Sequence, residues 1–292
     1  MKINRNLDIF LQIACCPKCN GKLMKIENGL QCHCCAKTFF YNSDDTLLCY
    51  PRTQAEKNAD KYEDEQFVRK YAGVFAYGDK VLARGQMESL HRTVSELILS
   101  SSINRHPRYI LDVGCGVGRA TFNCASCLHE TLTIGIDLSE QMLKMAKKFL
   151  VRKQVVELDL THCGFGRRKI KGFGLDNVFL IQGHAELLPF AESTFDLVIN
   201  VNLLDRVTEP SSTLKSVVSV LKPGGKFIFT SPLNWMNPQH WDKYSNKESI
   251  KELFESNGLL IDELFDGLIY REAQDARSYS DWTTMVISAT KK

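Results

Sequence analysis

The sequence has no long apolar run and no strong excess of charge of either sign. No stretch of its 292 residues approaches the roughly 20 apolar residues of a membrane-spanning helix, and its first residues lack the apolar core of a signal peptide. Lysine and arginine number 37 against 34 acidic residues, a net charge of +3, so bulk charge does not indicate a nucleic-acid binder. We therefore expect a soluble, cytoplasmic protein with no membrane partner.

What the chain does have is a hydrophobic content of 44%, enough for a proper core, and a glycine loop. Residues 110–118 read Ile-Leu-Asp-Val-Gly-Cys-Gly-Val-Gly, an apolar strand that ends in Asp112 and breaks at Gly114, Gly116 and Gly118. Glycine lets a backbone turn sharply and approach a ligand closely. A carboxylate beside this loop would repel a pyrophosphate and would suit a cationic cofactor. The alternative is a tight strand–helix turn without a ligand.

The order D-x-G-x-G-x-G resembles class I S-adenosyl-L-methionine (SAM) methyltransferases, and the resemblance runs from about residue 60 to the C-terminus. It implies an α/β fold, with a doubly wound, seven-stranded Rossmann-like sheet and one antiparallel strand near the edge. Ligands in such sheets bind at the carboxyl ends of the strands. The remaining strands are expected at 132–136, 178–182, 195–201, 226–230, 259–270 and 282–290.

The same resemblance implies which residues bind SAM. Asp137 follows the second strand about 20 residues beyond the glycine loop, where an acid is expected to hold ribose hydroxyls. Residues 183–190 resemble a G-D-A-x-x-L-P-F segment along the adenine, with His184 in place of the acid. A neutral imidazole can also accept a hydrogen bond, although an ordinary loop histidine is the alternative. The expected cofactor-binding residues are Asp112, Gly114, Cys115, Gly116, Gly118, Asp137, Leu138, Met142, His184, Ala185, Glu186 and Asn200.

Eleven cysteines are many for such a chain, and six of them lie between residues 15 and 35. Two C-x-x-C pairs in this segment match the spacing of a tetrahedral, structural zinc (Zn²⁺) site. The expected ligands are Cys16, Cys19, Cys32 and Cys35. The ligand register stays open, because Cys15, His33 and Cys34 are immediate neighbours. A disulfide framework is the alternative, less favoured for a chain without a signal sequence.

The cysteine-rich segment resembles short zinc ribbons of the Trm112 type, and the ribbon ahead of a ribosomal-RNA guanine-N1 methyltransferase. Such ribbons are structural, and they also contact RNA or a protein partner. We expect a zinc ribbon at 1–50, a linker and helical cofactor lid at 51–105 and a methyltransferase domain at 106–292. The insertion 151–177 is expected to be a solvated loop. Contact between its basic residues and RNA or an acidic partner is the alternative.

Four further segments resemble the methyltransferase domain of ovothiol biosynthesis, which methylates the imidazole of a thiolated histidine. They are the G-R-A-T-F loop at 118–122, N-L-L-D-R at 202–206, T-S-P-L-N-W at 230–235 and R-E at 271–272. The N-L-L-D-R form is also similar to the methyltransferase-like family that modifies histidines within proteins. The resemblance therefore implies transfer to the imidazole of a small-molecule histidine derivative or of a peptide or protein histidine.

With imidazole as the acceptor, residues in these four segments have specific expected roles. Free imidazole, with a pKa of about 6.5, is largely neutral near pH 7. A carboxylate facing its N–H would stabilise the cation formed during transfer. The expected catalytic residues are Asp205 as this carboxylate, Asn202 and Tyr279. The expected substrate-binding residues are Arg206, Trp235 and Arg271. The alternatives are a helix N-cap for Asp205, loop packing for Trp235 and a surface ion pair for Arg271.

Two other functions stay open at this point. An RNA base methyltransferase of the guanine-N1 type would use the ribbon and the basic residues at 167–171 for RNA recognition, and its binding would depend strongly on salt. A non-catalytic protein would instead use the ribbon to recruit a partner and the SAM fold as a scaffold. Failure to bind SAM would favour this last function.

Overall fold

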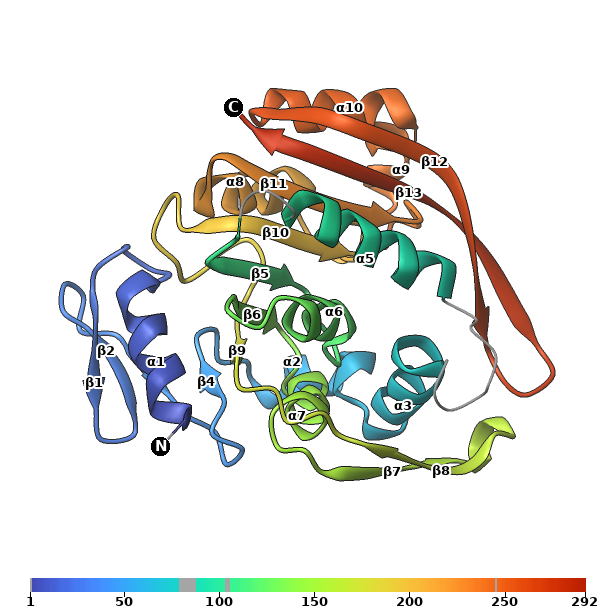
Figure 1. The fold of residues 1–292 in the computed structure, drawn as a ribbon, viewed down its shortest axis with the longest axis horizontal. Helices are drawn as coiled ribbons and strands as arrows, with labels where there is room; N and C mark the ends of the chain where they lie inside the picture. Colours follow the sequence, from blue (N-terminus) through green and yellow to red (C-terminus); the bar gives the residue numbers. More distant parts are fainter. Residues whose placement is uncertain (1, 79–87, 103–105, 245) are drawn as a thin grey trace.

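The centre of the structure is a doubly wound sheet with helices on both faces. The computed structural model describes residues 2–78, 88–102, 106–244 and 246–292. Figure 1 shows the eight-stranded sheet, whose strand order is β12-β13-β11-β10-β5-β6-β9-β4. In these residues no helix combines the length and apolar character needed to cross a membrane.

Seven of the eight strands are those expected from the sequence, and several are longer than expected. They are β5 (Tyr109–Val113), β6 (Leu132–Asp137), β9 (Val178–Gln182), β10 (Phe195–Val201), β11 (Leu221–Ser231), β12 (Leu259–Ala273) and β13 (Tyr279–Lys291). Strands β9, β6, β5, β10 and β11 run parallel, and β13 runs antiparallel to its neighbours β11 and β12. The parallel strands are almost continuously apolar because helices cover both of their faces. Their carboxyl ends share one edge, where a ligand is expected.

Helices cover both faces of this sheet. On one face α5 (Glu88–Ser102), α6 (Arg119–Cys127) and α7 (Glu140–Leu150) contribute to the core. On the other face lie α1 (Lys2–Ile13), α8 (Pro210–Val220) and α10 (Lys247–Ser256), with the short α9 (Gln239–Tyr244) before α10. Each helix presents one apolar stripe to the sheet, as its 3.6-residue period requires.

The N-terminal segment is built onto the sheet rather than tethered to it. Strands β1 (Leu23–Ile26), β2 (Gly29–Cys32) and β3 (Thr38–Phe40) form a small antiparallel sheet. Helix α1 places Phe10 against Phe179 of β9, with ring centroids 5.0 Å apart. The eighth strand, β4 (Leu47–Leu48), pairs in parallel with β9. The ribbon segment therefore supplies an edge strand of the central sheet (Figure 1).

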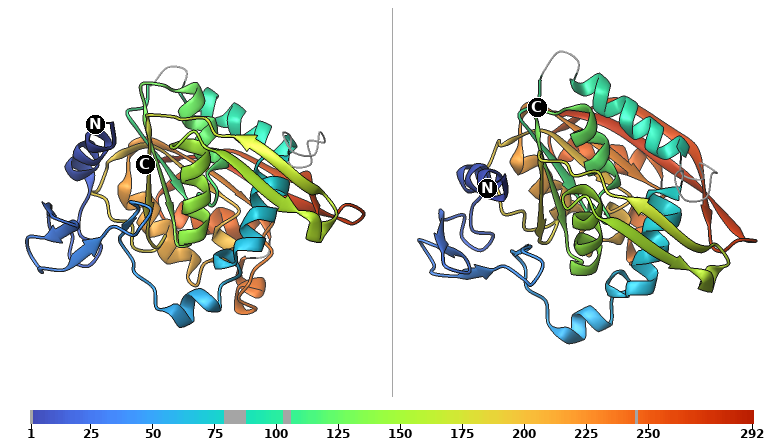
Figure 2. Two further views of the ribbon diagram at one scale, coloured as in Figure 1. Left: turned by 90° about the horizontal axis from the view of Figure 1, so that it is seen from below. Right: turned by 60° about the horizontal axis from the view of Figure 1, so that its bottom comes forward.

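A chain of short helices links this segment to α5. It consists of α2 (Gln54–Asn58), the 3-10 turn η1 (Lys61–Glu63), α3 (Glu65–Lys70) and the π-helix η2 (Tyr71–Ala76). In Figure 2 this blue-to-cyan stretch runs along the outside of the sheet. Helical pieces were expected between 51 and 105, while residues 79–87 and 103–105 of that range lie outside the described residues. π-Helices are rare and often mark functional sites.

The insertion at 151–177 is not the solvated loop expected from its charge. It forms an antiparallel hairpin of β7 (Val155–Leu160) and β8 (Gly166–Lys171), joined by the 3-10 turn η3 (Thr161–Cys163). Val156, Leu158 and Ile170 are buried in the core against α7, which explains why the segment is ordered as strands. Both this hairpin and the β12–β13 hairpin project from the same side of the molecule (Figure 2). They meet where the Ala276 N–H donates to the Cys163 carbonyl.

Candidate active site

In the glycine loop after β5, two of the three glycines lie tightly against neighbouring side chains. Gly114, Gly116 and Gly118 have φ angles of 74°, 52° and 84°, in the left-handed region that favours glycine. A Cβ on Gly114 would lie 2.7 Å from a methyl of Leu203, and one on Gly118 would lie 2.5 Å from a methyl of Leu150. At Gly116 the nearest neighbour would be the Tyr71 ring, at 3.6 Å. The loop thus leaves room above Gly116 alone, under the Tyr71 ring.

Two acids stand at the ends of neighbouring strands, in different environments. The Asp112 carboxylate is buried and accepts a hydrogen bond of 2.6 Å from the Thr121 hydroxyl. The Asp137 carboxylate is partly exposed and accepts from the backbone N–H groups of Gly116 and Ser139, both at 2.8 Å. Burial raises the pKa of each acid to about 6. Asp137 retains lone pairs for ribose hydroxyls, whereas Asp112 places a negative charge beneath the loop.

The segment around η1 closes over the start of α7. Ser139 caps this helix by accepting from the Met142 N–H. The Glu63 carboxylate accepts from the N–H groups of Glu140 and Gln141, at 3.0 and 3.3 Å. The Ser139 hydroxyl donates to the carbonyl of Tyr62. These contacts fix η1 beside Asp137, as a lid over the ribose position would require.

Some of the residues expected near the adenine lie at the surface, and others lie in the core. His184, Ala185 and Glu186 follow β9 and are partly exposed, and His184 Nδ1 accepts from the Glu186 N–H at 3.3 Å. Leu138 is partly exposed, while the Met142 side chain is buried in the core under α7. Sequence reasoning missed an aromatic residue beside this group: the ring centroid of Tyr50 lies 5.0 Å from that of His184.

A cleft opens beside the glycine loop. Its floor includes Gly114 and Cys115, and one wall is formed by Tyr71 and Phe75 of η2, whose rings meet edge to face at 5.2 Å. The other lining residues are Ala76, His91, Val94, Asp112, Val117, Arg119, Ala120, Val201 and Asn202. The cleft therefore combines an aromatic wall with polar and charged side chains, among them Asp112, Arg119 and Asn202.

Asn202 lies at the rim of this cleft with a left-handed backbone. Its φ is 54°, a conformation that asparagine adopts more readily than most other non-glycine residues. Its Nδ2 donates to the Tyr270 hydroxyl at 3.1 Å, and its Oδ1 accepts from the Thr230 hydroxyl at 2.9 Å. Both ends of the amide are thus held, and Tyr270 joins the site from β12. Sequence reasoning did not select Tyr270.

Asp205 follows on the turn η4 (Leu204–Arg206) with its side chain fully buried. Its Oδ2 lies 3.3 Å from Nη2 of Arg206. Neither carboxylate oxygen makes a hydrogen bond of good geometry within the described ranges. Burial raises the pKa of Asp205, with Arg206 opposing the shift. The Asn200 amide is also buried, and neither its nitrogen nor its oxygen has a hydrogen-bond partner among the described residues.

Three residues expected to bind or activate the acceptor lie elsewhere. Trp235 is buried and donates from Nε1 to the Tyr244 carbonyl. Arg271 is exposed and makes two hydrogen bonds of 2.7 Å with Asp281. Tyr279 is exposed beside Arg271, whose guanidinium lies 5.6 Å from the tyrosine ring centroid. The described lining of the cleft includes none of the three.

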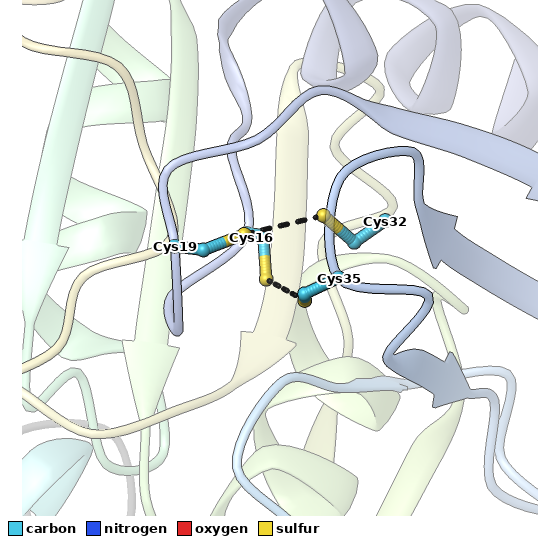
Figure 3. A group of neighbouring side chains, drawn as sticks. All are labelled: Cys16, Cys19, Cys32 and Cys35. Carbon is cyan, nitrogen blue, oxygen red and sulfur yellow. Dashed lines mark hydrogen bonds between the residues drawn. The ribbon is translucent and has the colours of Figure 1, made fainter.

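The four expected cysteine ligands converge in the ribbon (Figure 3). Their Sγ atoms all lie within 4.8 Å of one another. The Cys16–Cys35 and Cys19–Cys32 pairs are 3.7 and 3.5 Å apart. Zinc–sulfur bonds of about 2.3 Å in a tetrahedron place sulfurs roughly 3.8 Å apart, so the cluster fits zinc. The structure leaves Cys15, His33 and Cys34 out of this group, and all eleven cysteines are free.

Comparisons with known proteins agree with the fold and the glycine-loop site. A family model described as "Methyltransferase domain" matches residues 108–284. The ubiquinone/menaquinone biosynthesis C-methyltransferase UbiE of Escherichia fergusonii is 30% identical over 161 residues, which cover 53% of this chain and 56% of that protein. The demethylmenaquinone methyltransferase of Symbiobacterium thermophilum is 32% identical over 172 residues, covering 57% and 59%. The chain thus spans little more than half the length of these relatives.

A solved structure shows the same fold at low sequence identity. The SAM-dependent methyltransferase of Aquifex aeolicus superposes with a TM-score of 0.50 and 13% identity, over 78% of this chain and 99% of that one. The matched family region begins at β5 and ends within β13. The ribbon and the helices η1 to η2 lie outside it.

Proposed function

Since this chain belongs to the methyltransferase-domain family and is a SAM-dependent methyltransferase, we propose that it methylates a small planar aromatic acceptor. The observation that carries this proposal is the wall formed by Tyr71 and Phe75 above the glycine loop. Aromatic walls favour flat ligands, because ring faces and edges pack in offset or edge-to-face arrangements. Asn202 of the cleft lining, whose amide donates to the buried Tyr270 hydroxyl, then sets the orientation of the acceptor.

The residues present fit SAM as the cofactor. SAM supplies an electrophilic methyl group on a positively charged sulfur. Asp137 would accept from ribose hydroxyls, and the open position at Gly116 admits the close approach of a ligand. The charge of buried Asp112 lies beneath the loop and favours a cation there.

We assign proton handling on the acceptor to Asp205, which lies three residues beyond Asn202 of the cleft lining. Burial raises the pKa of the Asp205 carboxyl and of the Tyr270 hydroxyl. A carboxylate with a raised pKa is a better base near neutral pH. Asp205 would take a proton from the acceptor as the methyl group arrives. Asn202, held at both ends of its amide, would hydrogen-bond to the acceptor through its remaining capacity.

Histidine remains a narrower hypothesis about the acceptor, and the site gives it little support. Asn202 lines the cleft, and Asp205 and Arg206 lie three and four residues beyond it. The residue expected to hold a substrate carboxylate, Arg271, is paired with Asp281. The named relatives are methyltransferases of quinone biosynthesis, and UbiE is a C-methyltransferase. We therefore propose an aromatic ring as the acceptor, and leave open whether a ring carbon or a ring nitrogen receives the methyl group.

RNA is the less favoured acceptor. In the basic cluster on β8, Arg167 pairs with Asp159 and Lys169 with Glu157, so the hairpin partly neutralises its own charge. We also propose that the four ribbon cysteines hold one structural zinc ion. The support is the fit of their sulfur separations to a tetrahedral site.

The acceptor proposal is tested by labelled transfer. The full chain is incubated with methyl-labelled SAM and, separately, with hydroquinones and phenols, histidine derivatives, histidine peptides and RNA. We expect label in small aromatic compounds. Phe75→Leu keeps an apolar side chain but removes the ring, and should lower kcat/KM for the acceptor about tenfold while SAM affinity stays near wild type. Trp241→Leu, at an exposed tryptophan, is the control. Label in RNA alone would overturn the proposal.

A further inference from the structure

We propose that Tyr50, which the N-terminal ribbon segment carries, forms one wall of the adenine subsite. This inference rests on SAM as the cofactor and is independent of the acceptor. The family match begins at residue 108, so it does not include Tyr50. The strand order, the hydrogen bonds that hold Tyr50 and its exposed ring support this role.

Strand order gives the position of the base. The glycine loop follows β5, Asp137 ends β6 and His184 follows β9, and these three strands are consecutive in the sheet. A cofactor whose ribose lies at Asp137 and whose amino-acid end lies at the glycine loop must extend its adenine toward the end of β9. The next strand in this direction is β4. Whatever follows β4 therefore flanks the base.

Tyr50 is the residue that emerges from β4 at this edge. Leu47 and Leu48 pair in parallel with Ile181 and Gln182, and the Cys49 N–H donates to the Gln182 carbonyl at 2.8 Å. Parallel pairing makes both strands end at the same edge. Tyr50 consequently leaves the sheet beside the segment that begins at Gly183.

The Gln182 side chain then fixes the backbone of Tyr50. Its Oε1 accepts from the Tyr50 N–H at 3.0 Å, and its Nε2 donates to the Tyr50 carbonyl at 2.7 Å and to the Leu138 carbonyl at 3.1 Å. Gln182 itself is fully buried. One amide thus ties the ribbon segment to the residue that follows Asp137, on the other side of the expected base.

With its backbone held, Tyr50 presents its ring to solvent. The ring is tilted by 45° against the His184 ring, with centroids 5.0 Å apart, and the residue is 37% exposed. An exposed aromatic side chain on a fixed backbone loses little entropy when a ligand packs on it. Aromatic side chains commonly stack on nucleobases. The pair formed by Tyr50 and His184 therefore offers a π surface at the end of β9.

The inference is tested by calorimetric titration of the full chain with SAM and with S-adenosylhomocysteine. Tyr50→Leu keeps apolar bulk but removes the π face, and should lower the affinity for both ligands about 5- to 150-fold, the loss typical of one base–aromatic contact. Tyr50→Phe should stay within about twofold of wild type. Phe40→Leu, at a ribbon aromatic that is 52% exposed, is the matched control and should bind normally.

Each outcome decides the question. Wild-type affinity in Tyr50→Leu overturns the proposal, and so does an equal loss in Tyr50→Phe, which would show that the hydroxyl and not the ring face matters. Metal content and thermal midpoint are measured on every variant, so that a loss of affinity caused by ribbon unfolding is recognised and counts against direct contact. Methyl transfer is not the readout, so failure of the acceptor proposal leaves this result intact.

Discussion

The Asp137 carboxylate accepts a 2.8 Å hydrogen bond from the backbone N–H of Gly116. This contact joins the end of β6 to the glycine loop after β5, so the loop conformation and the orientation of the carboxylate proposed to bind ribose depend on each other. Because the carboxylate also accepts from the Ser139 N–H, it is preorganised before a ribose hydroxyl reaches it.

SAM affinity should depend on pH through Asp137. Burial raises the pKa of this carboxyl to about 6. Only the ionised form accepts at both oxygens, so SAM affinity should rise as pH increases from 5 to 7 and then level off. Asp137→Asn should weaken SAM binding at least tenfold at pH 7.5 and reduce this rise to the part that titration of Asp112 contributes. Calorimetry across the pH range measures both effects. A wild-type profile in the variant would contradict the role.

Asp112 should make the protein less stable as pH rises. Its pKa is about 6 in the folded state because the group is buried, against about 3.9 when unfolded. The folded state therefore binds more protons between these values, and the contribution is complete below pH 4 and lost by about pH 6. Asp112→Asn should flatten this part of the profile by on the order of 2–3 kcal/mol. Urea unfolding from pH 4 to 7 measures it, and an unchanged slope would refute it.

Glycine at 118 should be required for packing as well as for conformation. Gly118→Ala combines a φ of 84° with a Cβ 2.5 Å from Leu150. Gly224→Ala is the matched control, because its φ is 73° but a Cβ would meet nothing within 4 Å. We expect about 1 kcal/mol of destabilisation at Gly224 and about 2–4 kcal/mol at Gly118. Equal losses in urea unfolding would show that backbone conformation alone sets the cost.

Local patterns in the sequence predicted the parallel strands and the glycine loop. Each of these strands is a short apolar run flanked by turn-forming residues, and this pattern can be recognised from neighbouring residues alone. They did not predict β4, since Leu47 and Leu48 make a two-residue strand that exists only through pairing with β9. The exposed face of β12 also escaped prediction. Its pairing register with β13 shifts twice, between Ile261 and Glu263 and between Asp266 and Leu268. Such bulges change which alternate residues face inward.

The bulges in β12 therefore decide which of its side chains reach the site. Arg271 was expected to bind the substrate, but its two neighbours on β12 face inward instead. The Tyr270 hydroxyl accepts from the Asn202 amide, and Glu272 accepts from the Trp282 indole N–H. The ribbon cysteines behaved differently, because their C-x-x-C spacing requires only local turns. All four predicted ligands consequently came together.

Metal removal should weaken SAM binding as well as ribbon stability. The ribbon core includes Cys16 and Leu30, and it packs in the same cluster as Leu47 of β4 and Ile181 of β9. Cys16→Ser should lower bound zinc below one per chain and reduce SAM affinity several-fold, because β4 loses its support. Cys127→Ser, at an exposed cysteine of α6, should retain both. Metal analysis and calorimetry give the two readouts. Loss of zinc with full SAM affinity would show that ribbon and site are independent.

Asp205 should act on transfer and not on cofactor binding. Its carboxylate is buried three residues beyond Asn202, has no hydrogen bond of good geometry among the described residues and lies 3.3 Å from Arg206. Asp205→Asn keeps the shape and removes the base, so kcat should fall about 10²- to 10⁴-fold while SAM affinity stays within about twofold. Asp242→Asn, at an exposed acid of α9, is the control. Single-turnover transfer and calorimetry separate the two quantities. Because the pKa of Asp205 is raised, wild-type kcat should increase with pH through that pKa, and loss of SAM binding in the variant would instead place Asp205 in the cofactor site.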